Sequence, residues 1–128
     1  MSYYIAKTLG PGFDEAVRLT TAALKEEGFG VLTEIDVADT LKKKIGVDFR
    51  RYRILGACNP RLAHEALQIE ANIGTMLPCN VVVQETADGK VEVAAIDPVA
   101  SMMAVDNPRL KQAAEQVRDK LQRVVSRL

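Results

Sequence analysis

The sequence has little of several residue types, and each shortage narrows the class of protein. It has two cysteines and no tryptophan in 128 residues, and aromatic residues make up 5%. Two cysteines are too few for a disulfide-stabilised secreted scaffold of this length, so stability must come from the core. The low aromatic content argues against a protein that binds single-stranded nucleic acid by stacking on its bases.

Net charge and long apolar runs are lacking as well. The 17 lysines and arginines match the 17 aspartates and glutamates, so no overall positive field attracts nucleic acid or a membrane surface. The apolar runs at 80–83 and 91–96 are far shorter than the ~20 residues that cross a bilayer. The opening MSYYIAKTLGPGF has no basic segment followed by an apolar run, so we expect no signal peptide. We therefore expect a cytoplasmic protein with reduced thiols and no membrane partner.

What the chain does contain describes an ordinary globular domain. Hydrophobic residues make up 48% and charged residues 27%, which is typical of folded domains. A mass of 14.0 kDa suits one domain over residues 1–128 rather than two.

Strand-like runs and amphipathic helices follow one another along the chain, although they do not alternate strictly. Residues 13–27 carry an apolar stripe typical of a helix, and Gly28 is placed to end it. Three Asn-Pro or Asp-Pro pairs each predict a helix start, because Asn and Asp cap helices and Pro suits the first turn. These pairs begin at Asn59, Asp97 and Asn107, and the helix at Asp97 is expected to include residues 101–104. Strands are predicted over 3–9, 31–35, 49–57, 80–84 and 91–96, and a further short helix within 36–46.

The order of these elements predicts an α+β fold. Asp88-Gly89 lies between two strand-like runs and is a strong hairpin signal. The last helix has the clearest apolar periodicity of the chain, at Leu110, Ala114, Val117, Leu121, Val124 and Leu128. We expect an antiparallel sheet covered on one face by the two long helices, with short extra helices. The stripe of the last helix is expected to pack on the sheet rather than to self-associate, because the sheet needs a cover.

Several separated motifs resemble one known family. Ala57-Cys58-Asn59-Pro60 leads into a helix, and Leu77-Pro78-Cys79-Asn80 opens the next strand. The segments 28–46 and 96–98 are similar to the same family, the domain of unknown function 302 family, so the resemblance covers essentially the whole chain. It implies a β-α-β(4)-α arrangement and brings no activity and no catalytic residue.

Three residues are candidates for thiol or metal chemistry. Cys58 precedes a helix N-terminus, where the helix dipole favours a thiolate. His64 lies in the second turn of that helix, and Cys79 begins the following strand. Two thiols and an imidazole suit a soft transition metal, although Cys-x5-His is not an established ligand spacing. The alternative is that both cysteines are small buried residues without chemistry and that His64 lies on the surface.

A second candidate is the basic cluster of residues 42–53, which has the cations that bind phosphate groups. Asp39 and Asp48 interrupt it and only Tyr52 is placed to stack on a base, so we favour a solvated helix face and an edge strand protected by charge. Nucleic acid is therefore not an expected partner.

The third candidate is a set of methionines near prolines, comprising Met76, Met102 and Met103. Flexible methionine side chains suit adaptable apolar pockets and interfaces, although they also fill cores. We expect Met102 and Met103 to border a groove or a homodimer contact. The leading interpretation is a module without catalytic activity or cofactor that binds a small apolar ligand or a second copy of itself. The alternative is a thiol- or metal-dependent enzyme or sensor using Cys58 and Cys79.

Overall fold

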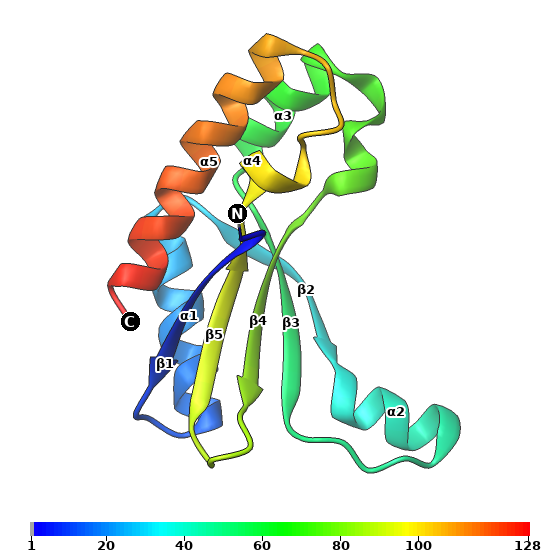
Figure 1. Cartoon of the computed structure of the whole chain (residues 1–128), viewed down its shortest axis with the longest axis vertical. Coiled ribbons are helices and arrows are strands. Elements are labelled where there is room, and N and C mark those ends of the chain that lie inside the picture. The colour runs from blue at the N-terminus through cyan, green and yellow to red at the C-terminus, as the bar shows by residue number, and fades with distance from the viewer. Residues whose placement is uncertain (1) are drawn as a thin grey trace.

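Five strands form one antiparallel sheet in the order β1-β5-β4-β3-β2 (Figure 1). The computed structural model describes residues 2–128. The strands are β1 (Tyr4–Leu9), β2 (Gly30–Asp36), β3 (Tyr52–Cys58), β4 (Cys79–Glu85) and β5 (Val91–Ile96). Strands β1 and β2 are the two edges of the sheet.

The two long helices cover one face of this sheet, as the sequence predicts. They are α1 (Phe13–Glu26) and α5 (Pro108–Ser126), and they lie together against the sheet in Figure 1. Alternate strand residues point toward them and form the main core with Leu24, Leu121 and Val124 of the helices. The element order is β-α-β(4)-α with short helices inserted, so the predicted α+β class is confirmed.

The predicted helix caps of the second half of the chain are all present. The side chains of Asn59, Asp97 and Asn107 accept hydrogen bonds from backbone N–H groups two or three residues later, at 3.2, 3.0 and 3.1 Å. They begin α3 (Pro60–Ile69), α4 (Pro98–Ser101) and α5, respectively. Each cap satisfies a backbone donor that no carbonyl of the helix itself reaches.

Three features differ from the sequence predictions by more than a residue or two. Strand β3 begins at Tyr52 rather than at residue 49, because α2 (Val37–Ile45) ends at a left-handed Gly46 and the chain returns to the sheet only six residues later. Helix α4 stops at Ser101. The backbone N–H of Met102 still donates to the carbonyl of Pro98, four residues back, whereas that of Met103 donates to the carbonyl of Ala100, three residues back. A 3-10 helix, η1 (Ala71–Met76), follows α3 and was not expected.

The first half of helix α5 extends beyond the end of the sheet (Figure 1). Its second half packs in the main core, whereas Leu110 near its start joins Ala66 and Ile73 in a second cluster of buried residues. The second half of the α5 stripe thus packs on the sheet, as predicted, whereas Leu110 at its start packs against α3 and η1 instead. No helix within residues 2–128 has the length and apolar character to cross a membrane.

Candidate functional site

The candidate site is an apolar groove at the end of the sheet from which α3, η1 and α4 leave. These short elements pack on the first half of α5 instead of on the sheet. Where the second cluster of buried residues meets the main core, a cavity of about 40 Å³ remains between them. Its wall includes Leu62, Leu77, Met102, Leu110 and Val117. The wall of this space is mainly apolar.

Two larger open hollows lie on either side of Met102. One, of about 270 Å³, is bordered by Val99, Met103, Val105 and Lys111 in addition to Met102. The other, of about 240 Å³, is bordered by Met76, Pro78 and Ser101, and Met102 again forms part of its wall. Met102 is the residue that the small cavity and both hollows share. We call this set of spaces the Met102 groove.

The predicted methionine candidates therefore gather at one place. Met76 borders one hollow, Met103 borders the other, and Met102 separates them. Met102 is partly buried, whereas 68% of Met103 is exposed. Neither methionine side chain is enclosed in the core, as a groove or a homodimer contact at these residues requires.

The two cysteines also reach this groove, from the ends of β3 and β4. Ala57 pairs directly with Cys79 across the two strands, and Cys58 follows at the next position. Both cysteines line the small cavity and both are free thiols. Burial, with a smaller contribution from nearby Cys58, raises the pKa of Cys79 to about 11, because a thiolate in an apolar site loses its hydration.

His64 does not join the cysteines. It is exposed on the outer side of α3, where its Nε2 lies 3.5 Å from the side-chain nitrogen of Gln68. Within residues 2–128, no three His, Cys, Asp or Glu side chains are grouped closely enough to hold a metal ion. The structure thus brings together two of the three residues of the predicted metal or redox site.

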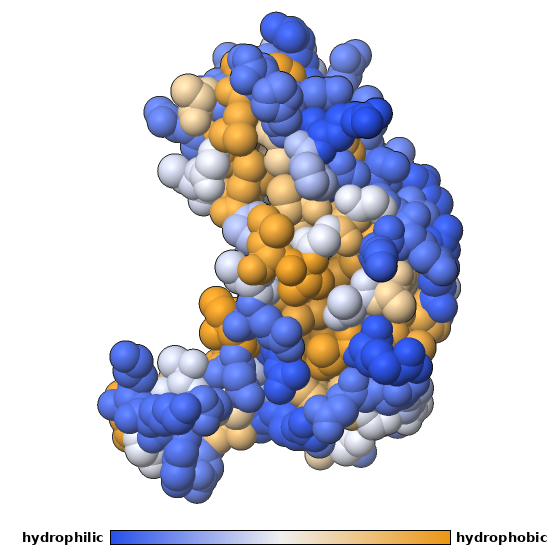
Figure 2. Space-filling view, turned by 180° about the vertical axis from the view of Figure 1, so that it is seen from behind, coloured by the Kyte–Doolittle hydropathy of each residue, from blue (hydrophilic) through white to orange (hydrophobic). Residues whose placement is uncertain are grey.

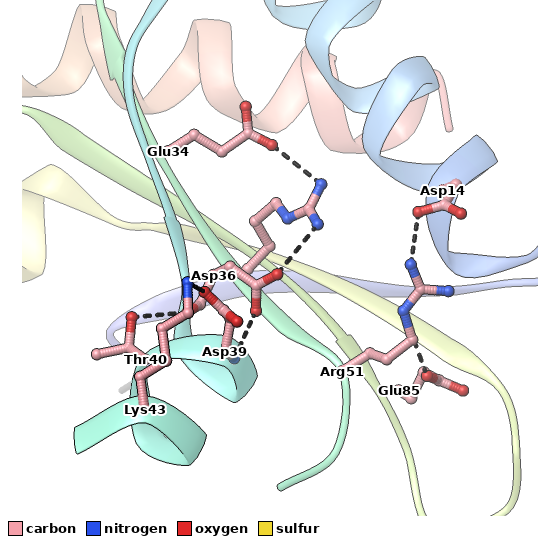
Figure 3. Close-up of polar contacts among 9 residues, drawn as sticks. Asp14, Glu34, Asp36, Asp39, Thr40, Lys43, Arg51 and Glu85 are labelled. Carbon is pink, nitrogen blue, oxygen red and sulfur yellow. Dashed lines mark hydrogen bonds and ion pairs between the residues drawn. The ribbon is translucent and has the colours of Figure 1, made fainter.

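The basic residues of 42–53 are largely engaged with acidic side chains. Lys42 and Lys43 pair with Asp48 and Asp39, at 2.8 and 2.9 Å. Arg51 lies 2.6 Å from Asp14, on the right of Figure 3. Such paired cations agree with the solvated, charged surface that the sequence favours over a phosphate-binding patch.

Arg53 is the central side chain of this charged region. Its guanidinium group lies between Glu34 and Asp36, at 3.1 and 3.5 Å. It also lies 5.5 Å from the ring centre of Phe13. These contacts hold β2 to the start of α1, so the region acts as a structural clamp.

Other groove residues were not singled out by sequence reasoning. Leu110, Ala114 and Val117 belong to the apolar stripe of the last helix, which predicts burial but not what the buried residues adjoin. The signal that could have identified them as groove residues is the length of this helix, because it is longer than the sheet that it covers.

The fold and the groove define a small α+β domain in which an antiparallel sheet carries two long helices on one face and an apolar groove at one end. The chain belongs to the family described as domain of unknown function DUF302, whose sequence profile matches residues 5–128. It is similar to a solved structure described as an uncharacterized conserved protein DUF302 from Bacillus stearothermophilus. The two share 29% identity with a TM-score of 0.93, over 99% of this chain and 98% of the other. No curated protein matches the chain.

Proposed function

We propose that the protein is a non-catalytic binding module, acting in the cytoplasm, whose Met102 groove takes a small apolar ligand. The observation that carries the proposal is the position of Met102 on the walls of two open hollows and of a mainly apolar cavity. A methionine side chain is flexible and apolar, so it can move aside and still contact the molecule that replaces it.

The size of the groove limits the ligand. Ordinary ligand sites have volumes of roughly 300–1,000 Å³, and each hollow alone is smaller, at about 240 and 270 Å³. A ligand that displaces Met102 occupies both hollows and reaches that range. A molecule small enough to fit one hollow can bind without moving Met102, and a longer one requires the displacement.

The chemistry of the wall limits it further. Apolar side chains dominate the larger hollow, and the charged group at its wall is the ammonium of Lys111. The smaller hollow also has the polar side chains of Thr75, Asn80 and Ser101 on its wall. A ligand with an aliphatic body and an acidic end matches this arrangement, because its charge would lie beside Lys111 at the open side.

The alternative use of the thiols receives less support. The raised pKa of Cys79 keeps it protonated at neutral pH, whereas the thiolate is the reactive form of cysteine. In this proposal both cysteines are groove walls, and the reducing cytoplasm keeps them as free thiols.

Methyl NMR tests the proposal directly. The protein is labelled at the methionine methyl groups and titrated with hexanoate and with 1-hexanol. We expect saturable shifts of the Met102 and Met103 signals, and tighter binding of hexanoate because of Lys111. The variant Leu67→Met adds a reporter on α3 that lines none of these spaces, and its signal should not shift. Shifts that are equal at all methionines, or absent at Met102, would refute the groove as a binding site.

A further inference from the structure

The second face of the sheet has no helix over it. Residues paired directly across an antiparallel sheet point to the same face, so the strand register identifies this open face. Its residues are Thr33, Ile35, Tyr52, Ile54, Gly56, Asn80, Val82, Gln84, Glu92, Ala94, Ile96, Tyr4, Ala6 and Thr8. An exposed antiparallel face ordinarily alternates with polar residues outward. Glu92 is the one charged residue among these strand residues, and the guanidinium group of Arg50 reaches the same face at Gln84.

An unbroken apolar row crosses the open face from edge to edge. Ile35 of β2 pairs with Ile54, Ile54 with Val82, Val82 with Ala94, and Ala94 with Ala6 of β1. Ile35 is 47% exposed and Ala6 is exposed, whereas the three middle residues are half-buried. Few charges and an apolar centre are the composition of an interface core rather than of free surface.

The same chain has a helix, α2, whose apolar side is not buried against the rest of the chain. Helix α2 projects from the far end of β2, away from the two long helices (Figure 1), and none of its residues is buried. It has nine residues, below the roughly 12–15 at which isolated helices become even marginally stable in water. From behind, the α2 region forms a projecting lobe, and a concave hollow lies between it and the opposite end of the molecule (Figure 2).

The apolar side of this lobe is largely exposed, although the guanidinium group of Arg50 lies over the ring of Phe49 at 4.4 Å. We call residues 37–49 the arm. Leu41 and Ile45 are one turn apart on α2, Ile45 is 67% exposed, and Val47 and Phe49 are exposed after it. The ring of Phe49 lies 6.1 Å from that of Tyr52, which belongs to the open face. The apolar side of the arm therefore continues the open face at its edge.

We propose that two copies of this chain form a two-fold dimer in which the arm of each copy covers the apolar row on the open face of the other. In a two-fold interface the same surfaces meet twice. The arm of the first copy therefore covers the row of the second, and the arm of the second covers the row of the first. The inference uses surfaces outside the Met102 groove and does not depend on ligand binding there.

Size and a near balance of charge agree with a second copy as the occupant. Within the arm, Lys42 and Lys43 pair with Asp48 and Asp39, so only the charge of Lys44 remains in excess. At the open face, Glu92 is offset by the guanidinium group of Arg50, which bonds to Gln84. Neither surface therefore has an excess of charge that would oppose contact between copies. Open face and arm together fall within the roughly 20–30 residues that each side of a standard interface contributes.

Sedimentation velocity over a range of protein concentrations gives the first test. The expected species is a dimer of twice the 14.0 kDa chain mass. Ile45→Glu on the arm and Ala94→Glu in the row should each weaken the dimer by about tenfold or more, because a carboxylate would be buried at the contact. Leu67→Glu, an exposed apolar residue on α3 outside both surfaces, is the matched control and should leave the dimer intact. Ala6→Glu at the exposed end of the row replaces Ala94→Glu if circular dichroism shows that the latter is unfolded.

Cysteine cross-linking tests the reciprocal geometry. One preparation carries Ile45→Cys and the other Ala94→Cys, and each is oxidised mildly both alone and after mixing. We expect the inter-chain disulfide to form mainly in the mixture, because residue 45 of one copy meets residue 94 of the other. A monomer at all concentrations would overturn the proposal, as would a dimer that Ile45→Glu leaves intact or whose mixture yields no more cross-link than either preparation alone. Neither result bears on hexanoate binding in the groove.

Discussion

Gly56 and Thr33 face each other across β3 and β2 so closely that a Cβ atom at position 56 would lie 2.1 Å from Oγ1 of Thr33. The same Cβ would lie 2.8 Å from Cγ of Pro78. Glycine is therefore required where the edge strand and the segment before β4 close over β3.

Gly56→Ala should lower the free energy of unfolding by about 1–3 kcal/mol, the usual cost of overpacking. Chemical denaturation measures the difference. The double variant Gly56→Ala/Thr33→Ala should recover part of it, since it removes the nearer contact but leaves Pro78. A single variant as stable as the parent would show that the three segments are not held this tightly.

Much of the fold could be predicted because its signals are local. The side chains of Asn59, Asp97 and Asn107 bond to backbone within three residues, so each cap is encoded where it acts. The alternation within each strand likewise needs only the neighbouring residues.

The candidate surfaces could not be predicted in the same way. The row from Ile35 to Ala6 draws one residue from each of five strands, and its continuity depends on strand order and register. Periodicity shows that strand residues alternate between two faces but not which face a helix covers. Met102 was a candidate by residue type, but its place between two hollows depends on how far α5 extends beyond the sheet.

Glu27 connects the end of α1 to the last turn of α5. Its carboxylate oxygens lie 3.0 Å from Nε of Arg123 and 2.9 Å from Nη2 of Arg127. Burial by itself raises the pKa of Glu27, but the two guanidinium groups outweigh it and hold the pKa below its ordinary value of 4.5. The stabilisation is therefore present above pH 4.5 and is lost as the pH falls through the lower, folded-state value.

Glu27→Gln should reduce stability at pH 7 by about 1 kcal/mol at most, since exposed arginines limit what such pairs contribute. Thermal melting at a series of pH values should show the difference from the parent shrinking in acid. Glu26→Gln, which breaks a single ion pair to Arg127, is the control and should have a smaller effect. A difference that persists unchanged at low pH would contradict the ionic origin.

Cys79 makes stability depend on pH at the alkaline end. Its pKa is raised from an ordinary value of 9.0 to about 11 by burial and by nearby Cys58. Stability is thus fully present below pH 9 and is lost as the pH rises toward 11, because the unfolded thiol ionises first. At 1.36 kcal/mol for each pKa unit, the loss by pH 11 is roughly 2–3 kcal/mol.

Cys79→Ala separates this effect from the titration of tyrosines and lysines. Denaturation curves of parent and variant between pH 8 and pH 11 should converge, since the variant has no thiol to ionise. Parallel curves over this range would mean that the Cys79 thiol ionises as readily in the folded chain as in the unfolded one.

The N-cap of α2 is especially important for the stability of this helix, because no residue of α2 is buried within a single copy. Asp36 Oδ1 accepts a hydrogen bond from the Asp39 backbone N–H at 2.9 Å, and Oδ2 lies 3.5 Å from Nη2 of Arg53. Asp36→Ala should destabilise α2 locally by about 1 kcal/mol, so its amides should exchange with solvent several times faster while those of the core strands do not change. Asp36→Asn retains a capping oxygen but loses the charge, and it should exchange at close to the parent rate. Equal acceleration in both variants would instead assign the stability of α2 to the ion pair with Arg53.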